Sequence, residues 1–159
     1  MLTRILLCGA ALAVLMIVAI SDQPAAAQEQ EEKPYKISED GTVDWYTFSG
    51  FRRYHADCHV CHGPDGLGSS FGPALVDSLK TMTYENFLEI TTNGRKNVST
   101  SSEKVMPSFG LNANVMCFVD DIYTYLKARS DDALPRGRPA KHADKPQEAK
   151  DRDTACMGG

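Results

Sequence analysis

The sequence lacks the patterns that indicate a repeat protein or a β-protein. Its 159 residues contain no internal repeat and no low-complexity array, which excludes a solenoid or a fibrous architecture. Stretches in which apolar and polar residues alternate, as they do in half-buried strands, are weak throughout the chain. Apolar residues recur instead at the spacing of helices, so the sequence predicts an all-α fold.

A closed zinc site is also excluded, because the chain lacks a second pair of ligands. Cys58 and Cys61 would form half of such a site, but no further Cys or His pair at metal spacing occurs. A thioredoxin-like redox pair would follow a strand, whereas the residues before Cys58 have the pattern of a helix. Neither chemistry accounts for the two cysteines.

The residue after Cys61 gives a better account of the pair. It is His62, and Cys-x-x-Cys-His is the spacing of covalent c-type haem attachment. Two thiols three positions apart can add across the two vinyl groups of one porphyrin, and His62 then lies under the iron as its proximal ligand. The sequence therefore predicts one covalently bound haem c, whose burial would supply much of the core.

The first 27 residues have the organisation of a secretory signal peptide. Arg4 supplies a positive charge, residues 5–20 form an apolar run without charge, and Ala25–Ala27 offer a cleavage site. The run is too short for a comfortable membrane span. We expect export to the periplasm as a chain that begins near Gln28, and the alternative is an uncleaved anchor.

Export leaves two cysteines without an assigned role. Cys8 is removed with the signal peptide, and the haem takes two more. Cys117 and Cys156 remain, in a compartment where thiols oxidise. We expect a Cys117–Cys156 disulfide. By restricting the unfolded chain, it would stabilise the folded state by about 4 kcal/mol. Two free thiols are the alternative.

The exported chain is short enough for one domain, which two polar segments flank. Residues 28–42 are acidic and are expected to form a solvated arm, which could steer a partner through long-range attraction. Residues 43–129 hold the haem string and the apolar helical stretches. Residues 130–159 mix proline, alanine and charges of both signs, so we expect an irregular tail that the disulfide tethers.

Three stretches of the central segment have helical periodicity, at residues 43–56, 83–92 and 114–128. Asp40 or Thr42 is expected to cap the first stretch. Gly50 lies in its middle, where glycine weakens a helix by roughly 1 kcal/mol, so we expect it to permit a close helix crossing. The intervening segments are expected to be loops or turns, at 63–73, 75–79 and 95–105.

The iron also needs a ligand on the face opposite His62. The candidates are Met82, Met106, Met116, Met157, His55, His59 and His142, or an open site. Met106 is favoured because it lies far enough along an irregular segment to reach the other face, and because Pro107 keeps it extended. A thioether ligand raises the reduction potential and leaves no place for oxygen or peroxide. With His62 and Met106 as the two iron ligands, the expected function of the haem is electron transfer.

Two further residues could tune the site. The Pro73 carbonyl could accept a hydrogen bond from the free ring nitrogen of His62, which would fix its tautomer. Arg95, together with Trp45 and the tyrosines, could bind the haem propionates. The alternative is that Arg95 is a solvated loop charge.

Several of these features together resemble the class I cytochromes c over residues 43–129. They are the Cys58–His62 string, Gly72-Pro73-Ala74-Leu75, Met106-Pro107, and the last helix with Tyr123 and Leu126. Gly50 and Tyr54 are similar to the family's helix-crossing pair. The resemblance implies a single-domain fold of three main helices around one haem c, in an electron-transfer protein rather than an enzyme.

A narrower resemblance, carried by the acidic arm and by Cys117 and Cys156, is to the four-cysteine cytochromes c associated with methanol metabolism in methylotrophic bacteria. It implies a soluble, monomeric one-electron carrier of the periplasm. The donor would be a quinoprotein methanol or alcohol dehydrogenase, and the acceptor another cytochrome or a terminal oxidase. No nucleic-acid partner is expected.

Two features depart from the family pattern, because the separation of His62 from Met106 is short for the class and the tail is long. The alternative function is a haem-based sensor or a peroxide-handling enzyme with an open axial site.

Overall fold

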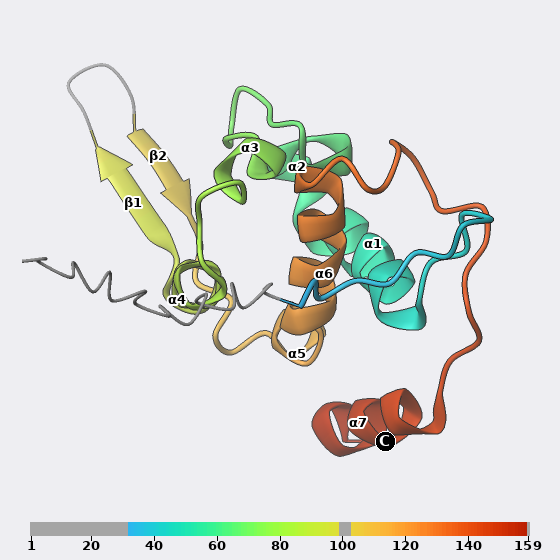
Figure 1. Cartoon of the computed structure of the whole chain (residues 1–159). Helices are drawn as coiled ribbons and strands as arrows, with labels where there is room; N and C mark the ends of the chain where they lie inside the picture. The colour runs from blue at the N-terminus through green and yellow to red at the C-terminus, as the bar shows by residue number, and fades with distance from the viewer. Residues whose placement is uncertain (1–31, 99–102, 159) are drawn as a thin grey trace, which may run out of the picture. The chain divides into compact units, whose positions relative to one another are not determined.

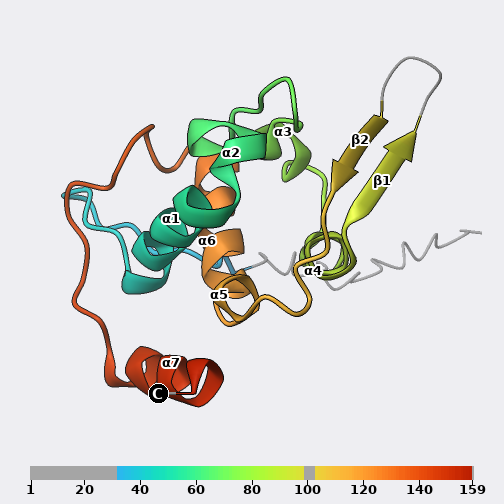
Figure 2. The ribbon, with the colours of Figure 1, turned by 180° about the vertical axis from the view of Figure 1, so that it is seen from behind.

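Two long helices lie side by side at the centre of the structure, α1 (Trp45–Asp57) and α6 (Val119–Ser130), as both views show (Figures 1 and 2). The computed structural model describes residues 32–98 and 103–158. The predicted signal peptide, residues 1–27, lies outside these ranges. Within them, no helix has the length and hydropathy that a membrane span needs.

Gly50 allows α1 and α6 to approach closely. A Cβ atom at this position would lie 1.8 Å from the Asp121 carbonyl oxygen, so even alanine would force the helices apart. The fully buried rings of Tyr54 and Tyr125 pack beside the crossing, with their centroids 5.7 Å apart. The close crossing that the sequence predicts at Gly50 is confirmed.

The start of α1 is set by the side chain of Asp44. The Asp44 carboxylate accepts a hydrogen bond from the Thr47 N–H at 2.9 Å, as an N-cap does. The prediction of Asp40 or Thr42 as the cap is wrong. Those two residues instead bond to each other in the turn before the helix.

Short elements connect the long helices around the haem string. The fourth helix begins after its cap Thr83, whose side chain accepts a hydrogen bond from the Asn86 N–H, and it ends at Gly94. Both ends agree with the sequence prediction. The bounds are α2 (His59–His62), the 3₁₀ helix η1 (Pro64–Gly66), α3 (Leu75–Ser78) and α4 (Tyr84–Asn93).

A β-hairpin occupies the segment that the sequence predicts to be a loop (Figure 1). β1 (Arg95–Val98) pairs antiparallel with β2 (Glu103–Met106), and Arg95 lies opposite Met106. Most of its described side chains are exposed, so the alternation that marks a half-buried strand is missing from the sequence. The structure remains mainly helical, in agreement with the predicted fold class.

The predicted last helix is divided in two. α5 (Ala113–Met116) is one turn long, and α6 begins only at Val119. Phe118 separates them, because its backbone leaves the helical conformation (φ −130°, ψ 15°) while its ring is buried. The Arg53 guanidinium lies 3.5 Å from the centroid of this ring.

The described part of the acidic arm, from residue 32 onward, packs against the tail. Tyr35 and Val43 are buried, and Val43 forms a parallel bridge with His142. The Tyr35 hydroxyl donates a hydrogen bond to Asp131 at 2.9 Å. Most described residues of the arm are exposed, but Tyr35 is buried and contacts the tail, and so does Val43 directly after the arm.

The tail itself ends in a helix, which corrects the prediction of an irregular segment. In α7 (Gln147–Met157), the Arg152 guanidinium donates two hydrogen bonds of 2.8 Å to the buried Asp121 of α6. Cys117 and Cys156 form a disulfide in the structure, with their Cα atoms 5.8 Å apart. The helical pattern of α7 is weak because only one of its residues is buried.

Candidate functional site

Six of the residues that the sequence assigns to the haem line a single cavity of about 380 Å³. This volume lies within the range of ligand and cofactor sites. The walls come from α2 and the loop after it, from α3 to α6, and from both strands of the hairpin. The six residues are Cys58, Cys61, His62, Pro73, Arg95 and Met106.

The haem string lies where α1 passes into α2. Cys58 ends the first helix, and the N–H groups of Cys61 and His62 bond back to its carbonyl at 3.2 and 3.0 Å. The two thiols and the imidazole are thereby held within one helical turn. Both thiols are free, and burial raises the pKa of the Cys58 thiol to about 12, so it stays neutral.

Pro73 orients the ring of His62. The Nδ1 atom lies 3.0 Å from the Pro73 carbonyl oxygen, the contact that the sequence predicts. Because a carbonyl only accepts hydrogen bonds, Nδ1 carries the proton and Nε2 keeps a lone pair for a metal. Gly72 lets the loop come this close, since a Cβ atom there would lie 3.0 Å from Nδ1.

The loop after His62 folds back onto the haem string. The Tyr54 hydroxyl donates a hydrogen bond to the Gly63 carbonyl at 2.5 Å, and the Gly68 N–H donates to the His62 carbonyl at 2.7 Å. Gly63 has φ +73°, and a Cβ atom on it would lie 2.2 Å from the Gly68 carbonyl oxygen. Glycine at this position is therefore required for the loop to close.

Two methionines line the cavity, Met82 before α4 and Met106 at the end of β2, and both are half-buried. The other axial candidates, which do not line it, are Met116, Met157, His55, His59 and His142. The ring of His142 instead stacks on Phe48, with 3.7 Å between centroids. Among the candidate side chains, Met82 and Met106 are therefore the two that line the cavity, and the open site remains the alternative to them.

The backbone at Met106 is fixed by a close contact with the end of α4. A Cβ atom on Gly94 would lie 2.6 Å from the Met106 carbonyl oxygen and 2.8 Å from the Ser108 nitrogen. Gly94 also has φ +75°, which side-chain-bearing residues rarely adopt. Gly94 therefore allows α4 to end at this point, and it allows the chain after β2 to pass close to that end.

The polar residues at the cavity mouth come mainly from the hairpin. Arg95, Asn97 and Lys104 are exposed and line the cavity. Asn97 and Lys104 were not predicted as site residues, because their position depends on the pairing of β1 with β2, which leaves no pattern in the sequence. Trp45 is not part of the lining and packs on Phe48, and no tyrosine lines the cavity either.

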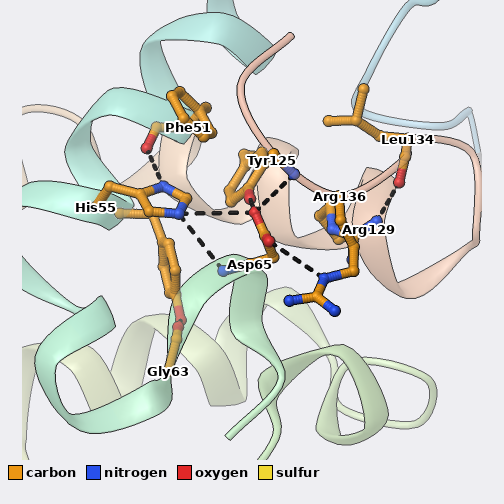
Figure 3. A network of polar contacts seen from close by, with 10 residues as sticks. Phe51, His55, Gly63, Asp65, Tyr125, Arg129, Leu134 and Arg136 are labelled. Atoms are coloured by element: carbon orange, nitrogen blue, oxygen red, sulfur yellow. Dashed lines mark hydrogen bonds and ion pairs between the residues drawn. The ribbon is translucent and has the colours of Figure 1, made fainter.

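A buried carboxylate lies just beyond the haem string (Figure 3). Asp65 has φ +59° in η1, and it accepts hydrogen bonds from the Tyr125 hydroxyl at 3.3 Å and the Gly137 N–H at 3.1 Å. Burial opposes its ionisation, but these bonds and Arg136 outweigh it and lower the pKa of Asp65. The sequence shows Asp65 only as a turn residue.

The chemistry of the lining fits a c-type haem. Two thiols in one turn can form two thioethers, the free Nε2 of His62 can bind iron, and a thioether is available from a methionine. Much of the remaining wall is apolar, as for a buried porphyrin. The apolar lining residues include Val60, Leu75, Phe87, Ile90, Ile122 and Leu126.

Several known cytochromes and one family model are similar to this chain in sequence. A family model described as cytochrome c oxidase, cbb3-type, subunit III matches residues 48–126. Cytochrome c-553I of Paracoccus denitrificans is 58% identical over 125 residues, which are 79% of this chain and 55% of the relative. The chain thus spans little more than half the length of that relative.

Two further matches cover more of the relative. Cytochrome c-555 of Methylococcus capsulatus is 39% identical over 100 residues, which are 62% of this chain and 75% of the relative. The crystal structure of the c-type cytochrome XoxG from Methylobacterium extorquens AM1 has a TM-score of 0.66 and 45% sequence identity, and the match covers 80% of this chain and 84% of that one.

Proposed function

We propose, on the premise that this chain belongs to the c-type cytochromes, that it is an exported one-electron carrier with a single haem c. The observation that supports this proposal is the cavity in which two thiols, an imidazole and a thioether meet. Bound haem c supplies an iron that alternates between its ferrous and ferric states.

The chain's own residues would hold and tune that iron. The Cys58 and Cys61 thiols would form the covalent links, so the cofactor would not dissociate. The hydrogen bond from His62 to Pro73 fixes the imidazole and makes its Nε2 more basic. Met106 would offer its thioether to the iron, which would raise the reduction potential and keep small molecules from binding there.

The rim of the cavity indicates what surface a redox partner presents. Val60, Phe71 and Val105 line the cavity and are 69, 74 and 58% exposed. Arg95 and Lys104 add two exposed cations to this apolar rim. We expect a partner patch that is apolar and flanked by carboxylates, in an interface below about 1,200 Å².

The described part of the acidic arm does not contribute to this rim. None of its residues lines the cavity, and its Asp40 carboxylate pairs with Lys141 of the tail at 3.1 Å. Steering of a partner by the arm therefore has no support from the described residues.

As donor we propose a quinoprotein methanol or alcohol dehydrogenase, and as acceptor another cytochrome or a terminal oxidase. The support is the resemblance to four-cysteine cytochromes c, together with the Cys117–Cys156 disulfide of the structure. Stopped-flow mixing with a purified dehydrogenase tests the donor. We expect one-electron reduction that slows as salt rises, and absence of reduction would exclude that donor.

The proposed site of action is the periplasm, where the carrier would act as a monomer. The support for export is the predicted signal peptide, residues 1–27. N-terminal sequencing of the exported protein should find a chain that begins near Gln28. An intact N-terminus would instead support an uncleaved anchor.

Carbon monoxide binding to the reduced protein tests the proposed function. Because the Met106 thioether would leave no free position on the iron, we expect little or no binding at neutral pH. Rapid and complete binding would contradict the carrier and favour the alternative, a haem-based sensor or a peroxide-handling enzyme. Mass spectrometry of the exported protein provides the prior check, since a bare peptide mass would contradict covalent haem altogether.

A further inference from the structure

We propose that His55 and Asp65 form a proton-binding site coupled to electron transfer, so that the reduction potential falls as the pH rises. The two side chains meet beyond the haem string, with 3.7 Å between His55 Nε2 and Asp65 Oδ1 (Figure 3). The inference rests on the proposed function, because the coupling requires the bound haem.

His55 has a hydrogen-bond partner in both of its protonation states. Its Nδ1–H donates to the Phe51 carbonyl at 2.8 Å, and its Nε2 accepts from the Asp65 N–H at 3.4 Å, which is the neutral arrangement. A proton added at Nε2 faces the Asp65 carboxylate instead. The side chain is 25% exposed, so the proton can exchange with solvent.

Asp65 presents a fixed negative charge to this proton. Its side chain is 7% exposed, and hydrogen bonds from Tyr125 and Gly137 hold one of its oxygens in place. Arg136 Nε lies 3.5 Å from the other oxygen, but the Arg136 side chain is 68% exposed and is therefore screened by water. The carboxylate charge thus remains available to His55.

Four further polar side chains lie around the pair. Burial raises the pKa values of Tyr54 on α1 and Tyr125 on α6, so both stay neutral. Arg129 on α6 donates a hydrogen bond to the Leu134 carbonyl. His59 on α2 is a second histidine nearby, and its ring centroid lies 5.8 Å from that of His55.

The pair is close enough to the cavity for its charge to act there. Cys58, three residues after His55, lines the cavity, and so does Leu126 beside Tyr125. Asp65 follows His62 by three residues. A negative charge here favours the more positive ferric state, whereas a proton on His55 favours the ferrous state.

In the coupled step, the transfer of one electron is accompanied by the release or uptake of a fraction of one proton. When the reduced protein gives one electron to its acceptor, a fraction of the His55 side chains release the Nε2 proton to solvent. Reduction of the protein takes up the same electron and the same fraction of a proton. If one full proton accompanied each electron, the equilibrium constant of reduction would change tenfold per pH unit. The midpoint potential would then fall by about 59 mV per pH unit, which is the upper limit.

The first test is the midpoint potential of the full haem-loaded protein between about pH 5 and pH 9, the range in which His titrates. We expect the wild-type potential to fall over this range and His55→Gln to make it flat. A flat wild-type curve would overturn the inference. So would a slope that survives in His55→Gln, or one that His59→Gln abolishes.

Asp65→Asn tests the carboxylate with little change of shape. The amide oxygen can still accept hydrogen bonds from Tyr125 and Gly137, and asparagine tolerates positive φ. We expect a higher potential above neutral pH and a transition displaced to lower pH. The matched control is Asp131→Asn, which removes another hydrogen-bonded carboxylate outside this network. An equal shift in both variants would contradict a role specific to Asp65.

A second readout measures the proton directly. NMR titration of the His55 ring should give a higher pKa in the reduced protein than in the oxidised protein, and equal values would contradict coupling. The outcomes also separate the two proposals. A reversible one-electron couple without pH dependence leaves the carrier intact and removes the proton site, whereas absence of a reversible couple removes the carrier.

Discussion

At the scale of single residues, the choice between Met82 and Met106 decides what the iron can do. Both side chains line the cavity, but only Met106 has its backbone fixed by strand pairing with Arg95 and by the contact with Gly94. A ligand whose backbone is held in place loses less conformational freedom when it binds iron. This favours Met106 over Met82.

Replacing each methionine by alanine separates the two possibilities. We expect Met106→Ala to lower the reduction potential and to remove the sulfur-to-iron absorption at the red end of the spectrum. Met82→Ala is the matched control, and it should keep the band while losing about 2–3 kcal/mol of stability to a cavity. Loss of the band in Met82→Ala alone would reverse the assignment.

Gly94 gives a second prediction at this scale. Gly94→Ala combines a positive φ with a clash against the Met106 backbone, so we expect a loss of at least about 2 kcal/mol in urea unfolding and a weakened red absorption band. Gly41→Ala is the control, because Gly41 also has positive φ but nothing lies within 4 Å of its Cβ position. Equal losses would show that the clash is not important.

At the scale of elements, the hairpin and α7 are the parts that extend the fold beyond its central helices. The hairpin brings Met106 and the exposed Lys104 to the cavity. The last helix binds α6 through Arg152 and Asp121, and the disulfide between Cys117 and Cys156 joins it to the end of α5. The two elements therefore have separate effects, one on partner binding and one on stability.

The charge of the hairpin should control the rate of electron transfer. We expect Lys104→Glu to slow the reaction with a partner that has an acidic patch, most strongly at low salt. Lys150→Glu, which makes the same charge change on α7 away from the cavity, is the control. Equal effects of both variants would mean that net charge, rather than the rim, governs the rate.

The disulfide should stabilise the chain without affecting the haem. The cross-linked residues are 39 positions apart, so replacing both by alanine should cost up to about 4 kcal/mol in urea unfolding, while the potential stays unchanged. Thiol titration of the unfolded, unreduced protein provides the check. Two reactive groups would mean that Cys117 and Cys156 are not bridged in solution.

The helices were predictable where an apolar stripe, a cap or a stop signal was present. Residues 83–92 form a helix in the structure between Thr83 and Gly94, and residues 43–56 correspond to α1. The hairpin was not predictable, because its polar strands are paired by backbone hydrogen bonds, which leave no sequence pattern. The helix α7 was not predictable either. It is held by side-chain hydrogen bonds and by a disulfide, and not by a buried apolar face.

The residues of the candidate site were predictable for a different reason. Covalent attachment demands a fixed spacing, so Cys58, Cys61 and His62 are readable from five consecutive residues. Met82 and Asp65 were not distinguishable from core and turn residues, because their positions depend on how distant segments pack.

At the scale of the whole molecule, two carboxylates tie the flanking segments to the central helices. Asp65 bonds to Gly137 of the tail, and Asp131 joins Tyr35 of the N-terminal segment to Lys127 of α6. In both cases burial opposes ionisation, but hydrogen bonds outweigh it and lower the pKa of the carboxyl group in the folded protein. The folded state is therefore stabilised when both groups are ionised.

This arrangement predicts a loss of stability in acid. A carboxyl group whose pKa is lower in the folded state stabilises the fold above its unfolded value of about 3.9, and this contribution disappears as the pH falls through the folded value. We expect the free energy of unfolding to decrease below about pH 4. Asp131→Asn should be less stable at neutral pH and less sensitive to acid, and an unchanged acid dependence would contradict this account.

The bridge between Val43 and His142 has a consequence for the order in which the protein matures. On the proposal that the chain is exported, the haem string would leave the channel some eighty residues before the segments that contact Val43 and Asp65. Cys58 and Cys61 would then be open to haem attachment before the two ends of the polypeptide meet.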